Sequence, residues 1–139
     1  MIKELVKDQE LLSKPAQPAT IDDLQVAEDL RDTMASLDNC ACLAANQIGS
    51  DKAVIAYGED DGDVRVMFNP KIKAAMRPYR TTESCLSLDE PHEVTRYFMI
   101  KVAYEAPLDG KLVERSRKLV DWEAQVVQHA IDHCAGKLV

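Results

Sequence analysis

Hydrophobic residues recur at the spacing of an amphipathic helix between Thr20 and about Asp38. They follow one another three or four residues apart, which places them on one face of a helix. Thr20 and Asp23 have the pattern of a capping box at its start. The pattern predicts a helix whose buried face carries Val26, Leu30, Met34 and Leu37.

A second helical stretch, residues 121–136, lies near the other end of the sequence. Asp121 can cap its start, and Gly136 can end it. Val126, Ala130 and His133 fall on one stripe of this helix. The stretch is therefore expected to pack one face against a core and to present histidine from that face.

Strand-like patterns fill most of the chain between the two helices. Asn69-Pro70 is expected to end the second strand, and the runs Gly58–Asp63 and Leu108–Lys111 are expected to be turns. Residues 1–19 are expected to form an extended arm, because two prolines interrupt any helix there. The predicted strands are Ala53–Tyr57, Val64–Phe68, Tyr79–Thr82, Glu93–Glu105 and Leu112–Val120.

These elements predict an α+β fold in one domain, residues 1–139. Antiparallel β-sheets would pack around the C-terminal helix, with the N-terminal amphipathic helix beside them. The 139 residues, 46% of them hydrophobic, suffice for one core but not for two.

The net charge of −7 limits the classes of partner that the chain is expected to bind. An acidic protein is repelled by nucleic acids and by anionic membranes, so neither is expected as a main partner, although local basic patches remain possible. The first residues have no apolar signal-peptide core. We therefore expect a cytoplasmic protein whose four cysteines are reduced.

His129 and His133 are four residues apart, so on a helix their imidazoles project from the same face and can bind one metal ion. Packed, hydrogen-bonded histidines are the alternative. Cys85 can be a small buried side chain. A thiolate joined to two imidazoles would instead leave a fourth metal position open for water, as catalytic sites do.

One amide and two further cysteines lie in the small, apolar run that precedes the first strand. Gln47 needs a hydrogen-bond partner if it is buried, and it can be either a structural amide or a donor to a substrate. Cys40 and Cys42 make a poor chelate by themselves, because paired zinc cysteines usually have at least two residues between them.

Three stretches together resemble peptide deformylase, the metal-dependent enzyme that removes the formyl group from the N-terminal methionine of new bacterial polypeptides. Residues 40–47, Cys-Ala-Cys-Leu-Ala-Ala-Asn-Gln, are similar to the family's G-x-G-L-A-A-x-Q. Residues 83–87, Glu-Ser-Cys-Leu-Ser, are similar to its E-G-C-L-S. Residues 128–133, Gln-His-Ala-Ile-Asp-His, are similar to its Q-H-E-x-D-H. The order and spacing also fit, so the likeness spans the whole chain.

The resemblance implies a metal held by Cys85, His129 and His133. In the family this divalent ion is usually iron(II), and often nickel or zinc in purified material. The Gln47 side chain and the Leu86 backbone N–H would stabilise the oxyanion.

The resemblance also implies the substrate, which would be an N-formylmethionyl peptide or nascent chain met near the ribosome. Its backbone would pair with Ala41, Cys42 and Leu43, and its methionine would enter an apolar pocket.

The chain departs from the family pattern at the catalytic base. Ala130 stands where the family has the glutamate that moves the proton, so turnover is expected to be strongly impaired. Asp132 is expected to orient an imidazole rather than replace that base, and Glu83 is a weak candidate.

Other departures lie around the same site. Cys40, Cys42 and Ser84 replace glycines, and Gln125 replaces an arginine expected to pair with the aspartate. A deliberate Glu→Ala change in an active enzyme would explain Ala130 but none of these, which favour a divergent member.

Two other interpretations remain. The chain can be a non-catalytic binder of metal and peptide N-termini, or its metal site can be structural, with Cys42 or Cys134 closing the fourth position.

Overall fold

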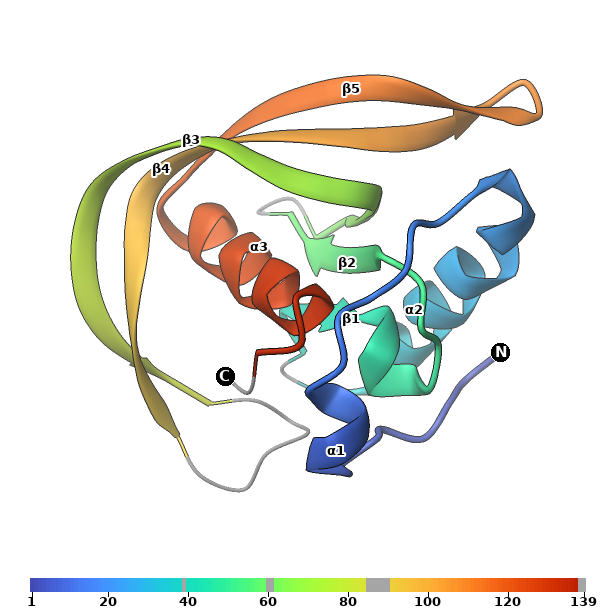
Figure 1. Cartoon of the computed structure of the whole chain (residues 1–139), viewed down its shortest axis with the longest axis horizontal. Helices are drawn as coiled ribbons and strands as arrows, with labels where there is room; N and C mark the ends of the chain where they lie inside the picture. The colour runs from blue at the N-terminus through green and yellow to red at the C-terminus, as the bar shows by residue number, and fades with distance from the viewer. Residues whose placement is uncertain (39, 60–61, 85–90, 138–139) are drawn as a thin grey trace.

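A five-stranded antiparallel sheet curves around helix α3, Asp121–Cys134, in the computed structural model (Figure 1). The structure describes residues 1–38, 40–59, 62–84 and 91–137. The strands follow one another in the sheet in sequence order, and each pairs with the next. They are β1 Cys42–Ala44, β2 Val54–Gly58, β3 Val64–Glu83, β4 His92–Leu108 and β5 Lys111–Val120.

The expected α+β architecture is confirmed, with one correction in β3. Asn69-Pro70 does not end a strand, because β3 continues through it and joins two of the predicted strands into one of 20 residues. The register against β4 shifts between Phe68 and Lys71, so the pair sits in a bulge.

Tertiary contacts of Asn69 explain this continuity. Its φ of 52° is a left-handed conformation that asparagine tolerates better than most residues. Its side chain accepts from the Ala19 N–H, and its Nδ2 donates to the Ala19 carbonyl and to Glu105. The amide thus takes over hydrogen bonds where the ladder is interrupted.

The predicted N-terminal helix is present and begins as expected. A short 3₁₀ turn, Ile21–Asp23, leads into α2, Leu24–Ser36. Thr20 and Asp23 form the capping box. The buried face of α2 includes Leu30 and Met34.

Helix α3 differs from the prediction only at its start. Asp121 is its first residue rather than a cap, and its φ is 56°. Gly136 follows the helix at φ 80°, and a Cβ there would lie 2.5 Å from the Ser13 carbonyl oxygen. Glycine is therefore required both by the conformation and by the close approach of the N-terminal arm.

The N-terminal arm is not wholly extended, which corrects the prediction. It contains the one-turn helix α1, Gln9–Leu12, which begins at the Asp8 cap. Its backbone also donates to the Gln47 and Cys134 carbonyls, from Val6 and Ala16, at 2.7 and 2.8 Å. The arm therefore ties the end of α3 to the 3₁₀ turn Ala45–Ile48.

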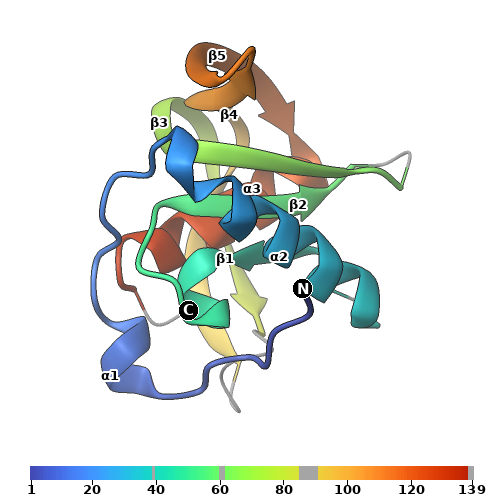
Figure 2. The same cartoon turned by 90° about the vertical axis from the view of Figure 1, so that its right-hand side faces the viewer.

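Two clusters of buried apolar side chains pack against the sheet. One joins α3 to Ala44, Tyr57 and Ile100, and the other joins α2 to Leu43 and other residues of the sheet. Figure 2 shows α2 and α3 in a view turned by 90°. Leu43 and Ala44, which are neighbours in β1, thus pack into different clusters. These contacts hold β1 beside α3. In the described part of the chain, no helix is long and apolar enough to cross a membrane.

Candidate metal centre and active site

His129 and His133 bring their Nε2 atoms within 3.1 Å of each other. Both are buried, with exposures of 7% and 0%. Two imidazoles that bind one tetrahedral ion at about 2.0–2.1 Å hold their nitrogens about 3.3 Å apart. The pair therefore fits a shared divalent ion.

Glu83 determines which nitrogen of His129 can bind a metal. Its Oε1 lies 2.8 Å from Nδ1 of His129. An ionised carboxylate only accepts hydrogen bonds, so Nδ1 carries the proton. In the neutral ring, Nε2 then presents its lone pair toward His133, which is the form a metal ligand needs.

Glu83 is itself held by several donors. Arg96 donates Nε and Nη2 to its two oxygens at 2.9 and 2.7 Å, and Gln125 donates Nε2 at 3.0 Å. Burial opposes ionisation, but the hydrogen bonds from His129, Arg96 and Gln125 outweigh it and lower the pKa of Glu83 to about 2. The carboxylate stays ionised and is a very weak base.

Arg96 links the two acidic residues nearest the histidines. It is 3% exposed, and its third nitrogen, Nη1, donates to Asp132 at 2.5 Å. The prediction that Asp132 orients an imidazole is wrong, because that contact is made by Glu83. Gln125 bonds to Glu83 and accepts from the Tyr79 hydroxyl, while Asp132 pairs with Arg96 and with Lys137.

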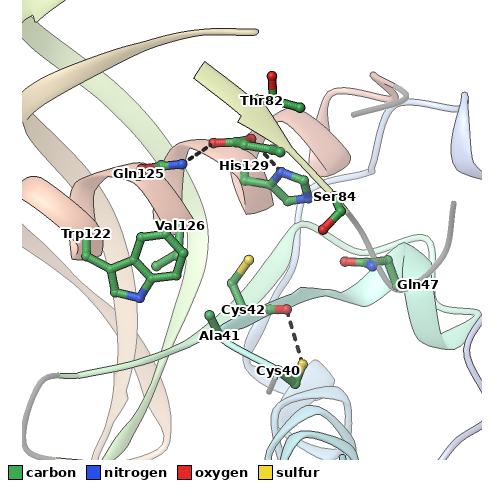
Figure 3. A pocket seen from close by; sticks show the side chains of 11 residues that line it. Cys40, Ala41, Cys42, Gln47, Thr82, Ser84, Trp122, Gln125, Val126 and His129 are labelled. Atoms are coloured by element: carbon green, nitrogen blue, oxygen red, sulfur yellow. Dashed lines mark hydrogen bonds and ion pairs between the residues drawn. The ribbon is translucent and has the colours of Figure 1, made fainter. Parts of the chain in front are cut away.

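A pocket of about 280 Å³ opens beside His129. Cys42, Gln47 and Trp122 line it, together with Glu83 (Figure 3). The Cys42 thiol points into this pocket, on the side where His129 lies. Among the described lining residues, Glu83 is the one carboxylate.

Gln47 is both structural and close to the pocket. It is 2% exposed, and its Oε1 accepts from the Ala44 N–H at 2.9 Å. That bond directs the Gln47 side chain from the 3₁₀ turn toward β1. The two N–H donors of the side chain are on Nε2. Asn46 donates to the His133 carbonyl at 2.7 Å and so joins this turn to α3.

The predicted site residues are brought together only in part. Gln47, Ala41 and Cys42 line the pocket with His129, whereas Leu43 is buried on the α2 side. Ala130 is fully buried and brings only a methyl group to the core beside α3.

Two of the predicted residues, Cys85 and Leu86, lie outside the described residues. Within the described ranges, no group of three or more metal-ligating side chains is present. The three-ligand set therefore stays a prediction.

Cys134 packs against the apolar cluster that joins α3 to the sheet. Burial raises the pKa of its thiol to about 12 in the metal-free chain.

Arg96 was missed as a site residue, although one feature of the strand pattern pointed to it. It has the same parity along β4 as Ile100 and Val102, which are buried. A lone arginine on the buried side of a strand requires a buried acidic partner. That signal predicts an ion pair, but not that its partner is Glu83.

The chain is similar to known proteins over its whole length. The family model described as polypeptide deformylase matches residues 2–139. A peptide deformylase of Clostridium beijerinckii is 38% identical over 141 residues, covering all of both chains.

Solved structures agree with this match. A peptide deformylase from Acinetobacter baumannii with Met-Ala-Ser bound superposes with a TM-score of 0.85 at 26% identity, covering 99% of this chain and 97% of that one. The enzyme from Thermus thermophilus superposes with a TM-score of 0.85 at 30% identity, covering 99% and 83%.

Proposed function

This chain belongs to the polypeptide deformylase family, and we propose that it binds N-formylmethionyl peptides at a metal centre and deformylates them slowly. The observation that carries the proposal is the pair His129 and His133, with Nε2 atoms 3.1 Å apart and one ring oriented by Glu83. Such pairing with a carboxylate is typical of metal-binding histidines.

His129 and His133 would hold the metal together with Cys85, which follows Glu83 by two positions. Iron(II) is the ion we propose in the cell, with nickel or zinc as substitutes. A bound divalent ion would supply Lewis acidity and make a water molecule acidic enough to serve as a nucleophile. Glu83 would keep His129 in the ligating tautomer throughout.

The substrate would lie in the pocket beside His129. We propose that its backbone pairs with residues 41–43 and that Gln47 Nε2 and the Leu86 N–H donate to the developing oxyanion. The Oε1 bond of Gln47 to Ala44 supports this, since it fixes the amide before any substrate arrives. The Met-Ala-Ser peptide bound by the Acinetobacter relative supports the same substrate class.

Proton transfer is the step in which this chain would be deficient. Ala130 has no titratable group. Glu83 has a pKa of about 2, so it is a poor base at neutral pH, and the Asp132 carboxylate is engaged by Arg96. A positioned acid–base group contributes roughly 10²- to 10⁴-fold to a rate, so turnover would be lower by about that factor.

A second candidate function is binding without turnover. The Cys42 side chain in the pocket favours it, because that thiol takes space near His129. Under either function we propose a cytoplasmic protein that meets new polypeptides near the ribosome.

Release of formate from formyl-Met-Ala-Ser by nickel-loaded protein tests the proposal. We expect slow release that is lost in His133→Ala, together with stoichiometric binding of the metal. If the protein binds metal stoichiometrically and binds the peptide but releases no formate, the second candidate function, binding without turnover, is the one supported. Failure to bind metal would refute both.

A further inference from the structure

Two carboxylates of α2 hold the α-amine of Met1. The amine donates to Oδ1 of Asp29 at 2.9 Å and also to Oδ2 of Asp32. These aspartates are three residues apart, so they lie on one face of the helix. Figure 2 marks the N-terminus beside α2. In the described part of the chain, neither aspartate forms another ion pair, so the amine is the cation that both share.

Asp29 depends on this amine because it is buried. The residue is 8% exposed, and its carboxylate also accepts from Nε2 of Gln25 at 2.9 Å. Burial raises the pKa of Asp29, but the hydrogen bonds from Gln25 and from the Met1 amine outweigh it, so the pKa lies below its ordinary value. A buried carboxylate that loses its cation is unfavourable unless it takes up a proton. The free amine therefore stabilises the ionised form of Asp29.

The residues that follow the amine are attached to the same part of the protein. The Lys3 N–H donates to Oγ1 of Thr33, a fully buried residue of α2, at 3.0 Å. Leu5 packs against the apolar cluster of α2, and the Val6 N–H donates to the Gln47 carbonyl at 2.7 Å. The amine is thus the outer end of a segment that runs along α2 and reaches the 3₁₀ turn beside the pocket.

A formyl group on Met1 is incompatible with these contacts. It would convert the charged amine into a neutral amide with a single N–H, which cannot pair with two carboxylates. It would also add a carbonyl oxygen, and this atom only accepts hydrogen bonds, as the ionised carboxylates beside it do. The aspartate pair therefore distinguishes a deformylated N-terminus from a formylated one.

We propose that Asp29 and Asp32 form a binding site for the α-amine that deformylation of this chain produces, so that residues 1–6 dock on α2 only after the formyl group of Met1 is removed. The reaction that must precede docking is hydrolysis of the formyl amide. Water cleaves the C–N bond, and the products are formate and a protonated amine. Any active deformylase can supply this step, so the inference does not depend on turnover by the chain itself.

A comparison of two forms of the whole chain tests this. A reconstituted bacterial translation system without deformylase gives the formylated form, and treatment with an active deformylase gives the free amine. Intact mass distinguishes the two forms and shows whether the group stays in place during each measurement. The formylated form should unfold at a temperature about 2–4 °C lower. The amides of Lys3 and Val6 should also exchange their hydrogens faster in this form.

Removal of the carboxylates should abolish the difference between the two forms. In the double variant Asp29→Asn with Asp32→Asn, the formyl group should no longer change the unfolding temperature. Asp32→Asn alone changes a half-exposed side chain and keeps the buried carboxylate, so a smaller difference should remain. Glu28→Gln removes a charge from an exposed position of the same helix and should keep the full difference. Circular dichroism checks that each variant is folded.

Other outcomes overturn the proposal. Equal unfolding temperatures and equal hydrogen exchange in the two forms of the unmodified chain would mean that Asp29 does not need the amine. A difference that persists in the double variant would mean that the formyl group acts at another place. A difference that disappears equally in Glu28→Gln would reduce the effect to the net charge of α2.

Discussion

Glu83 accepts the Nδ1 proton of His129 across 2.8 Å, from a strand that is 46 residues away in the sequence. This contact sets the tautomer of one imidazole of the candidate metal pair. Since Arg96 donates to both oxygens of Glu83, the orientation of His129 depends on a buried network as well as on its own helix.

Glu83→Gln should weaken metal binding by about 10- to 100-fold, the usual effect of removing a carboxylate that orients a metal-bound histidine. The change keeps the size of the side chain but removes its charge. Competition with a chromophoric chelator measures the affinity. Glu93→Gln, in the exposed pair with Arg80, is the matched control and should leave it unchanged. Equal metal affinities of the unmodified chain, Glu83→Gln and Glu93→Gln would show that Glu83 does not contribute to metal binding.

Arg96→Met should destabilise the metal-free protein by about 3–5 kcal/mol, because Glu83 and Asp132 would lose their shared partner. Urea unfolding gives the free energy. Arg80→Met, which breaks an ion pair between exposed side chains, should cost about 0–1 kcal/mol. A loss no larger in Arg96→Met than in this control would contradict the role of the network.

Acid should selectively destabilise the same network. The pKa of Glu83 is lowered from 4.5 to about 2, so its contribution to stability is complete above about pH 4.5 and is lost as the pH falls toward 2. The full contribution is of order 3 kcal/mol. Unfolding free energies of the metal-free chain and of Glu83→Gln should therefore converge across this range. A difference that stays constant between these pH values would show that Glu83 does not titrate as described.

Cys42→Gly should tighten binding of Met-Ala-Ser by about tenfold, since removal of one small group from a pocket changes affinity by roughly that factor. Isothermal titration of the nickel-loaded protein provides the measurement. Cys40→Ser removes a thiol from the same pocket while keeping its size, and it should have little effect. If Cys42→Gly binds no better, the thiol does not occupy the peptide's position.

Local patterns were sufficient to predict both main helices, the β4–β5 hairpin and the histidine pair. The i, i+4 spacing of His129 and His133 depends only on the helix that carries them. Helix α1 was missed because four residues are too few for a periodic pattern. The continuity of β3 was missed because Asn69-Pro70 has the composition of a strand end, whereas the contacts that override it come from Ala19 and Glu105.

The orientation of His129 could not be predicted from local patterns, because it depends on contacts between separate elements. Glu83 and Arg96 meet because β3 and β4 pair along their length, and Asp132 joins them from α3. Only that combination decides which carboxylate orients His129.

Hydrolysis of formyl-Met-Ala-Ser by nickel-loaded protein, compared between this chain and Ala130→Glu, shows whether the missing base limits the reaction. We expect the carboxylate to raise kcat by about 10²- to 10⁴-fold, because the metal pair and Gln47 are already in position. Equal, negligible rates in two proteins that bind metal and peptide alike would contradict it, since the missing base would then not be what limits the reaction.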